Sequence, residues 1–349
     1  MSTLQEANRA EATMMFREAA EAPAAVQRQL DKNAAVITRI GKKLQAMDPR
    51  LIVTVARGSS DHAACYAKYL FETRSGCFTV SAGPSIFSVY GTKMNFAGSL
   101  CLVISQSGAS PDLLAAAEAA RVGGAFVVAL VNVADSPLAA LADEIVELQA
   151  GPEMSVAATK SFISSLSATI HLLNAWRPDG ALDRALKALP EQLADAWDSD
   201  WSAALEPVAS SKDLFVLGRG PGLGIAYEAA LKFKEVCGLH AEGFSSAEVL
   251  HGPVTIARGG YPVLVFAQDD ETFPGISALA DDLAKRDVQL ITAGLEHEAA
   301  INLPTPGAHA VTGPLLRIQG FYRFANQLAL HLGLDPDRPP FLNKVTATV

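Results

Sequence analysis

Residues 100–114 read LCLVISQSGASPDLL, and this stretch decides the fold. A mostly apolar run is followed by a turn of hydroxyl side chains and glycine, and a helical pattern begins at Pro111. Because proline suits the first position of a helix, we expect a buried strand at Leu100–Ser105 that leads through a turn into a helix. The stretch therefore predicts one strand–turn–helix step of an α/β fold.

Further short apolar runs occur before and after this strand, and helical segments rich in Ala and Leu separate most of them. Alternation of this kind predicts parallel strands joined by right-handed helical crossovers. The runs are Leu51–Ala56, Cys77–Val80, Phe126–Val131 and Ile145–Leu148.

The chain also matches itself at a single offset. Arg57-Gly58 falls on Arg219-Gly220, a shift of 219 − 57 = 162 positions, and glycines and apolar residues elsewhere agree in that register. We therefore predict two tandem copies of one α/β unit built on parallel strands. The same shift relates Gly76 to Gly238, Gly151-Pro152 to Gly313-Pro314 and Phe162 to Phe324, and it places strand-like runs at Leu214–Leu217, Val263–Ala267 and Val288–Ala293.

The length of 349 residues suits two domains. We predict helices over residues 1–47 with an interruption at Pro23, a first domain over 48–177 and a second over 202–334. A linker is expected near Pro178–Trp201, and a tail over 335–349 follows the second domain.

Composition and charge restrict the class of protein. The formal net charge of -9 opposes binding to nucleic acid, since that affinity comes chiefly from Lys and Arg. No apolar stretch approaches the ~20 residues of a membrane span, and the N-terminus lacks a signal-peptide pattern, so we expect a cytoplasmic protein. Neither a disulfide framework nor a zinc site is indicated by the widely spaced Cys65, Cys77, Cys101 and Cys237.

The turn after Leu100–Ser105 is a candidate anion site. Backbone N–H groups, hydroxyls and the positive end of a helix dipole would converge there. Because the turn has no Lys or Arg, it suits a monoester phosphate without magnesium or another cofactor. The alternative is an ordinary serine-rich turn with a capping hydroxyl. The candidate ligands are Ser105, Gln106, Ser107 and Ser110.

A second hydroxyl turn strengthens the first interpretation. Ser59 and Ser60 follow the first strand, and we expect them beside the first turn at the carboxyl edge of the sheet. In the second copy the shifted position reads Asp269-Asp270-Glu271, which would repel a phosphate. The first copy alone is therefore expected to hold the anion.

Titratable residues gather in the second copy. Glu228, Lys232 and Glu235 are spaced by four and three residues, so they project from one helix face. Such spacing usually marks a solvated ion pair, and the alternative is an acid/base site. His251 precedes Gly252-Pro253, which predicts a loop that exposes the imidazole.

These features resemble the sugar isomerase, or SIS, family, which includes the isomerase half of glucosamine-6-phosphate synthase and stand-alone deaminases. The resemblance covers nearly the whole chain. It is carried by Met15–Pro23, Arg57–Ser60, Ser105–Ser110, Ser155–Lys160, Gly218–Gly220, Glu228–Glu235, His240–Glu242, Glu248–Pro253 and Leu342–Lys344.

The resemblance implies two tandem SIS domains, each a five-stranded parallel sheet in a three-layer αβα (flavodoxin-like) sandwich, and a homodimer with shared active sites. It implies that the serines and Gln106 hold the phosphate of a small sugar phosphate and that the Val156 segment lines the sugar. Glu235 matches the carboxylate that moves a proton between sugar carbons 1 and 2, with Lys232 beside it. His251 matches the residue that opens the ring, and Lys344 matches a tail lysine that can form a Schiff base with the ketose.

Among activities, the resemblance points to aminosugar phosphate chemistry. With only ~45 residues before the first strand, we expect no glutaminase domain and therefore no use of glutamine as nitrogen source. The leading hypothesis is conversion of glucosamine 6-phosphate and water into fructose 6-phosphate and ammonia. The alternatives are a plain aldose–ketose isomerase and a non-catalytic phosphosugar-binding regulator.

Overall fold

The computed structural model describes residues 10–344 and contains two five-stranded parallel sheets with flanking helices. The predicted α/β class with two tandem units is confirmed. One compact unit comprises residues 24–153, 160–187 and the chain from 343, and we call it the first unit. The second unit comprises the chain up to residue 23, residues 154–159 and residues 188–342.

The first sheet has the strand order β2-β1-β3-β4-β5, and every neighbouring pair is parallel. β3 and β4 lie in the middle and are almost wholly buried, which explains their continuous apolar sequences. The strands are β1 (Leu51–Val55), β2 (Phe78–Ser81), β3 (Leu100–Ser105), β4 (Phe126–Val131) and β5 (Glu144–Glu147).

Helices cover both faces of the first sheet. α4 (Ser59–Ser75) and α8 (Lys160–Trp176) pack together on one face. The other face carries α5, α6 and α7, whose apolar residues share a core cluster with β1, β3 and β4. The remaining helices of this unit are α3 (Ala22–Met47), α5 (Ser85–Ser88), α6 (Pro111–Val122) and α7 (Pro137–Leu141).

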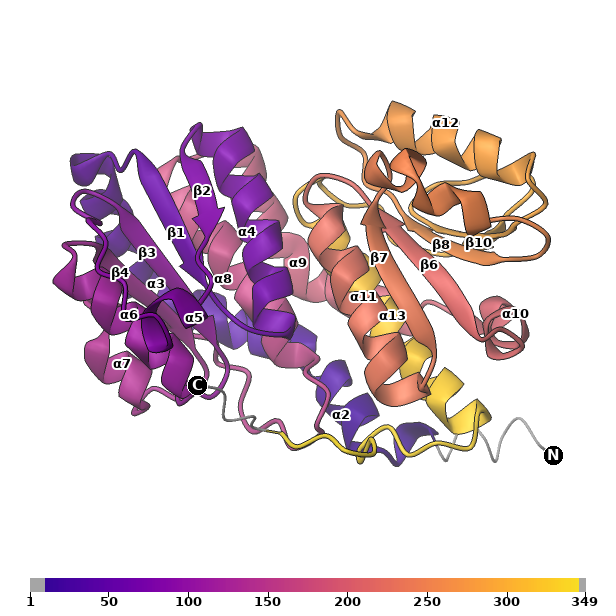
Figure 1. The fold of residues 1–349 in the computed structure, drawn as a ribbon, viewed down its shortest axis with the longest axis horizontal. Coiled ribbons are helices and arrows are strands. Elements are labelled where there is room, and N and C mark those ends of the chain that lie inside the picture. Colours follow the sequence, from indigo (N-terminus) through magenta and orange to yellow (C-terminus); the bar gives the residue numbers. More distant parts are fainter. Residues whose placement is uncertain (1–9, 345–349) are drawn as a thin grey trace. The chain divides into compact units, whose positions relative to one another are not determined.

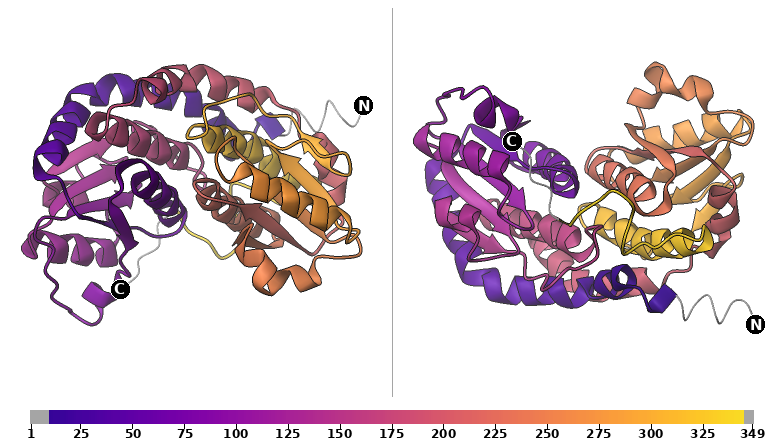
Figure 2. Two further views of the ribbon diagram at one scale, coloured as in Figure 1. Left: turned by 90° about the horizontal axis from the view of Figure 1, so that it is seen from above. Right: turned by 60° about the horizontal axis from the view of Figure 1, so that its bottom comes forward.

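The second sheet has the order β10-β9-β8-β6-β7, which is the order of the first sheet for the corresponding strands. In Figure 1, α12 (Phe273–Ala284) lies on one side of this sheet, and α11 (Gly222–Cys237) and α13 (Gly313–His331) lie on the other. Figure 2 shows the same three layers of this unit from two further directions. The strands are β6 (Asp213–Gly218), β7 (His240–Ser245), β8 (Pro262–Phe266), β9 (Gln289–Ala293) and β10 (Ile301–Leu303).

Shorter helices complete the second unit. α12 and two 3-10 turns share an apolar core cluster with β6, β8 and β9. α11 and α13 pack tightly against each other on the opposite face. The shorter elements are α2 (Met14–Ala20), α10 (Leu205–Ala209), η1 (Ser202–Ala204), η2 (Glu248–His251) and η3 (Pro253–Ile256).

The offset of 162 positions relates most elements of the two sheets. β1, β2 and β3 begin at residues 51, 78 and 100, and β6, β7 and β8 begin at 213, 240 and 262. The helices α4 and α11 end at Gly76 and Gly238, which both adopt the left-handed conformation that glycine tolerates best. The register ends after β9, because β10 and α13 begin earlier than the shift requires.

The structure differs from the predicted pattern in its connections. The linker region is a helix, α9 (Gly180–Asp198), that begins in the first unit and ends in the second. Within the expected N-terminal helical region, α2 and α3 are separated by Glu21, and Pro23 lies in the first turn of α3; residues 1–9 of that region lie outside the described part. The domain boundaries at 47, 177, 202 and 335 stay predictions, and residues 345–349 of the tail lie outside the described part. No helix within residues 10–344 is long and apolar enough to cross a membrane.

Candidate active site

The hydroxyl turn after β3 has a tightly defined backbone. The Oγ atom of buried Ser105 accepts a hydrogen bond from the backbone N–H of Gly108 at 3.1 Å. Gly108 has φ +61°, and a Cβ atom there would lie 2.2 Å from Oγ of Ser136. Only glycine therefore fits this position of the turn.

Hydroxyl groups of the same turn remain available at the start of α6. Ser110 is the N-cap residue, but its side chain makes no capping hydrogen bond. The Oγ atom of Ser107 accepts only a long hydrogen bond of 3.4 Å from the N–H of Ala109. Both side chains and that of Gln106 are partly exposed. The turn therefore differs from one that is capped by its own N-cap hydroxyl.

The second hydroxyl turn lies beside the first, as expected from the pairing of β1 with β3. Ser59 and Ser60 are the first residues of α4, and both are partly buried. Arg57 in this turn donates from Nε to Oδ2 of Asp112 at 2.9 Å, and the Asp112 side chain is fully buried in the first turn of α6. This ion pair ties the two turns together.

The acid/base candidates on α11 form a buried cluster. The Nζ atom of Lys232 lies 2.5 Å from Oε2 of Glu235 and 3.3 Å from Oε1 of Glu228. The hydroxyl of Tyr322 on α13 donates to the same Oε1 at 3.1 Å. The Lys232 and Glu228 side chains are 1% and 0% exposed, whereas Glu235 keeps 21%. The solvated surface pair considered from spacing alone is therefore excluded.

The charges in this cluster stabilise one another. Burial alone would lower the pKa of Lys232, but the neighbouring carboxylates of Glu228 and Glu235 outweigh it and raise the pKa well above its usual range. Lys232 is thus a permanent cation near neutral pH. Glu235 is the most exposed side chain of these three.

His251 ends the 3-10 turn η2, and its side chain is exposed, as the sequence predicted. Gly252 follows with φ +150° and open space around its Cα, so the chain turns sharply there. The imidazole is therefore accessible to a ligand.

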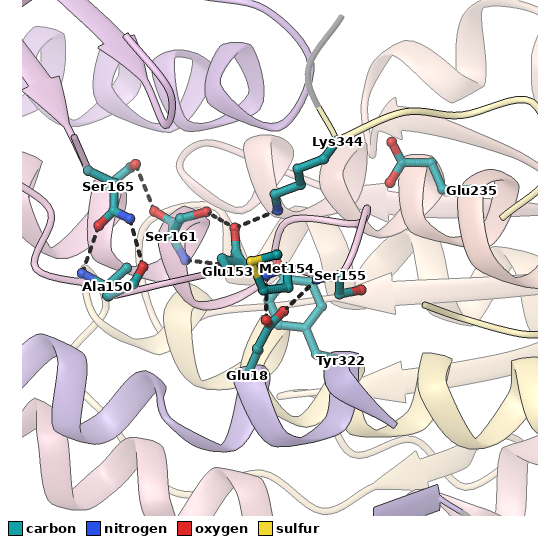
Figure 3. A network of polar contacts seen from close by, with 12 residues as sticks. Glu18, Ala150, Glu153, Met154, Ser155, Ser161, Ser165, Glu235, Tyr322 and Lys344 are labelled. Atoms are coloured by element: carbon teal, nitrogen blue, oxygen red, sulfur yellow. Dashed lines mark hydrogen bonds and ion pairs between the residues drawn. The ribbon is translucent and has the colours of Figure 1, made fainter. Parts of the chain in front are cut away.

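The segment that contains Val156 is held by the leading helix. Glu18 on α2 is buried, and its carboxylate accepts hydrogen bonds from the backbone N–H groups of Met154 and Ser155 (Figure 3). Val156 itself is partly buried. A buried carboxylate that satisfies two backbone donors fixes the path of this segment.

Lys344 forms an ion pair within the first unit. Its Nζ atom lies 3.1 Å from Oε2 of Glu153, whose side chain is fully buried. Ser161 at the start of α8 donates to the same carboxylate from Oγ at 2.6 Å and from its backbone N–H at 3.1 Å (Figure 3). The tail lysine is thus held at a defined carboxylate.

The structure groups the predicted residues by unit. The phosphate candidates of both hydroxyl turns and Lys344 belong to the first unit, whereas Lys232, Glu235, His251 and Val156 belong to the second. Sequence reasoning missed the residues that position them, namely Glu18, Asp112, Glu153 and Tyr322. Each of these residues contacts a partner that is more than 50 positions away in the chain. The spacing of neighbouring residues in the sequence therefore could not predict their roles.

Comparison with known proteins gives the family. A family model for the SIS domain matches residues 47–175 and 208–294. The chain belongs to the SIS domain family. A curated relative, glutamine–fructose-6-phosphate aminotransferase (isomerizing) of Gloeobacter violaceus, is 31% identical over 353 residues, which cover 95% of this chain and 58% of the relative. The chain therefore spans somewhat more than half the length of that SIS relative.

Solved structures share the fold. A Silicibacter pomeroyi protein described as a phosphosugar isomerase is 44% identical, with a TM-score of 0.89 over 93% of this chain and 100% of that one. The glucosamine-6-phosphate deaminase of Thermotoga maritima is 19% identical, with a TM-score of 0.77 over 96% of this chain and 100% of that one. The second likeness concerns the SIS fold alone.

Proposed function

We propose that this chain interconverts aldose and ketose forms of a phosphorylated sugar. The observation that carries the proposal is the cluster on α11, where buried Lys232 lies between two carboxylates and Glu235 stays partly exposed. Removing a proton from a carbon beside a carbonyl or imine needs such a base. The adjacent cation stabilises the anion that forms.

In the proposed reaction, His251 moves a proton from the C1 hydroxyl to the ring oxygen and opens the ring. Glu235 then takes the proton from C2, and the resulting carboxylic acid returns a proton to C1. Lys232 stabilises the intermediate negative charge. The hydroxyl turns after β1 and β3 hold the phosphate, and the Val156 segment lines the sugar.

We further propose that the substrate is an aminosugar phosphate. The proton shift in glucosamine 6-phosphate yields a ketimine at C2, and water hydrolyses it to fructose 6-phosphate and ammonia. Support comes from relatives whose names include fructose 6-phosphate and an amino transfer. The resemblance of Lys232, Glu235 and His251 to the family's acid/base residues supports the same chemistry.

A plain aldose–ketose isomerase of a hexose phosphate is the second candidate. The Silicibacter pomeroyi protein, which is 44% identical, is described as a phosphosugar isomerase and favours it. This reaction needs the same base and cation but no hydrolysis of an imine.

One assay separates these proposals. The purified chain is incubated in D2O with glucosamine 6-phosphate, galactosamine 6-phosphate and glucose 6-phosphate, and ammonium, ketose and deuterium at C1 and C2 are measured. Equal amounts of ammonium and ketose support the deaminase. Ketose and deuterium without ammonium support the isomerase. Binding of all three with neither product nor exchange contradicts both and indicates a regulator.

We propose that Lys344 serves the ketose end of the reaction. Its ion pair with Glu153 and the anchoring of that carboxylate by Ser161 support a defined position for the amine. Borohydride added with fructose 6-phosphate would trap a Schiff base as a mass increase on the peptide with Lys344. An unmodified peptide would contradict covalent participation.

We also propose that the chain forms a cytoplasmic homodimer. Exposed apolar side chains in the first unit support an interface, since Phe78, Val89 and Tyr90 are 73%, 62% and 77% exposed. Analytical ultracentrifugation would measure the oligomeric state, and a monomer at micromolar concentration would contradict the dimer.

A further inference from the structure

A buried arginine without a carboxylate partner lies in the second unit, apart from the residues proposed for catalysis. Arg317 is the fifth residue of α13 and is 7% exposed. Its Nε atom donates to the backbone oxygen of Ala293 at 3.3 Å. Among residues 10–344, Nη1 of Arg317 finds no hydrogen-bond partner, and the guanidinium forms no ion pair.

Two glycines make room for this guanidinium. Gly294 follows β9 with φ +84°, and a Cβ atom there would lie 2.3 Å from both Nε and Nη2 of Arg317. A Cβ atom on Gly313, the first residue of α13, would lie 2.5 Å from Nη1. The backbone is therefore shaped around a charged side chain that it does not neutralise.

Arg317 lines a cavity of about 860 Å³ that is formed entirely by residues 268–317. This volume lies within the range of pockets that bind small organic ligands, roughly 300–1,000 Å³. The cavity follows the carboxyl ends of β8 and β9, the edge where ligands of such sheets bind. Its polar lining includes Gln268, Asp269, Ser277, Glu296, Asn302 and His309.

The charge of Arg317 persists at neutral pH. Burial lowers the pKa of its guanidinium to about 10, and the negative charge of Asp270 opposes that shift. A cation this deeply buried is costly unless it meets a counter-charge. Asp270 makes no hydrogen bond to this guanidinium within the described residues, and its carboxylate instead accepts hydrogen bonds from the backbone N–H of Thr272 at 2.8 Å and from Nε2 of Gln268 at 2.9 Å.

The acidic run Asp269–Glu271 after β8 predicted that the second copy repels phosphate, but Arg317 of α13 lines the same cavity. Oε1 of Gln268 is also buried without a hydrogen-bond partner in the described chain. An anionic group near Arg317 and the N-terminus of the 19-residue helix α13 would satisfy the guanidinium.

We propose that this cavity is a second ligand site, which binds a small organic anion that also carries hydroxyl or amino groups. Arg317 binds the phosphate or carboxylate, and the positive end of the α13 dipole adds to the attraction. Asp269 and Glu296 repel a second anionic group and accept hydrogen bonds from hydroxyls or an amine. The cavity lining includes no residue of the hydroxyl turns in the first unit and none of the Glu228, Lys232 and Glu235 cluster on α11.

The test counts bound ligands rather than turnover. Calorimetry of the full chain uses inorganic phosphate, glucosamine 6-phosphate and L-glutamate as probes, with variants of each site. A Ser107→Ala/Ser110→Ala variant weakens the proposed phosphate site, and Arg317→Met removes the guanidinium at similar length. We expect at least one probe to bind the Ser107→Ala/Ser110→Ala variant. Adding Arg317→Met to that variant should weaken the affinity for this probe at least about tenfold, because a pair of charge-assisted hydrogen bonds is lost.

Thermal unfolding provides a second measurement. Without a probe, Arg317→Met should unfold at the same or a higher temperature than the unaltered chain, because an uncompensated buried charge is replaced by an apolar side chain. With the probe bound, it should lose the stabilisation that the unaltered chain gains. If Arg317→Met fails to fold, Gly313→Ala crowds Nη1 while keeping the charge and should weaken binding in the same direction.

The proposal is overturned if none of the three probes binds in a manner sensitive to Arg317→Met or Gly313→Ala. It is also overturned if Arg317→Met lowers stability without a probe and leaves the affinity for all of them unchanged, because Arg317 would then be structural. Failure of the proposed catalytic function would leave these binding results intact, since no readout depends on turnover.

Discussion

The Nζ atom of Lys232 lies 2.5 Å from Oε2 of Glu235, and the two side chains differ sharply in exposure, at 1% and 21%. The cation is enclosed while the carboxylate keeps a path to solvent. A second carboxylate, Glu228, holds the ammonium from the other side at 3.3 Å. Lys232 therefore needs no substrate to stay charged, and the partly exposed carboxylate of Glu235 lies beside a fixed positive charge.

Replacing Glu235 by Gln should abolish the proton shift with little change in binding. Glutamine keeps the size of the side chain but cannot accept the proton, so kcat should fall ~100- to 10,000-fold. Deuterium exchange at C1 and C2 of the substrate measures the step directly. Glu206→Gln, at an exposed carboxylate of α10, is the matched control and should keep full exchange. Undiminished exchange in Glu235→Gln would assign the base to another residue.

Replacing Lys232 by Met should cost stability as well as activity. The change leaves the fully buried carboxylate of Glu228 without the Lys232 ammonium, and breaking a buried ion pair costs about 3–5 kcal/mol. Urea unfolding would measure the loss. Lys234→Met, at an exposed position on the same helix, is the control and should change stability by less than ~0.5 kcal/mol.

The double variant Glu228→Gln/Lys232→Met tests the same ion pair by a thermodynamic cycle. Lys232→Met leaves the negative charge of Glu228 buried without its ammonium partner, and Glu228→Gln removes that charge. The double variant should therefore be more stable than Lys232→Met alone. Additive losses would show that Lys232 and Glu228 do not stabilise each other.

The central strands and the hydroxyl turns were predictable from local pattern. Leu100–Ser105 and Phe126–Val131 have the bounds that their apolar runs predicted, since a strand buried on both faces must be apolar throughout. β7 was missed because its sequence HAEGFS is polar, which an edge strand tolerates. β10 spans only Ile301–Leu303, too short a run to stand out.

The burial of the charged groups was not predictable in the same way. Spacing places Lys232 and Glu228 on one helix face, but it does not say what covers that face, and the cover includes Tyr322 of α13. Arg317 was missed for a related reason. It interrupts an apolar helical run, a position at which long cationic side chains usually extend to solvent. Its burial depends on the space left by Gly313 on the same helix and by Gly294, which follows β9.

Replacing Arg57 by Met should disturb the phosphate turn from outside it. Arg57 compensates the fully buried carboxylate of Asp112 in the first turn of α6, so its loss leaves that charge without its 2.9 Å partner. We expect a loss of about 1–3 kcal/mol in the free energy of unfolding and a higher KM for the sugar phosphate. Thr38→Ala, at an exposed hydroxyl of α3, is the comparison for nonspecific effects on this unit. An unchanged KM would mean that the turn keeps its shape without the ion pair.

Stability at mildly acidic pH should depend on His171 in α8. Burial lowers the pKa of its imidazole, an effect that Asp183 only partly opposes, and Nδ1 is buried without a hydrogen-bond partner in the described chain. The unfolded chain therefore takes up a proton near pH 6.5 while the folded chain resists it. The stabilising contribution is complete above pH 6.5 and is lost as the pH falls through the lower folded pKa. Urea unfolding at pH 7.5, 6.5 and 5.5 should show this decline in the native chain and a shallower one in His171→Gln. The exposed His240→Gln serves as the comparison, and equal slopes for the native chain and His171→Gln would contradict the assignment.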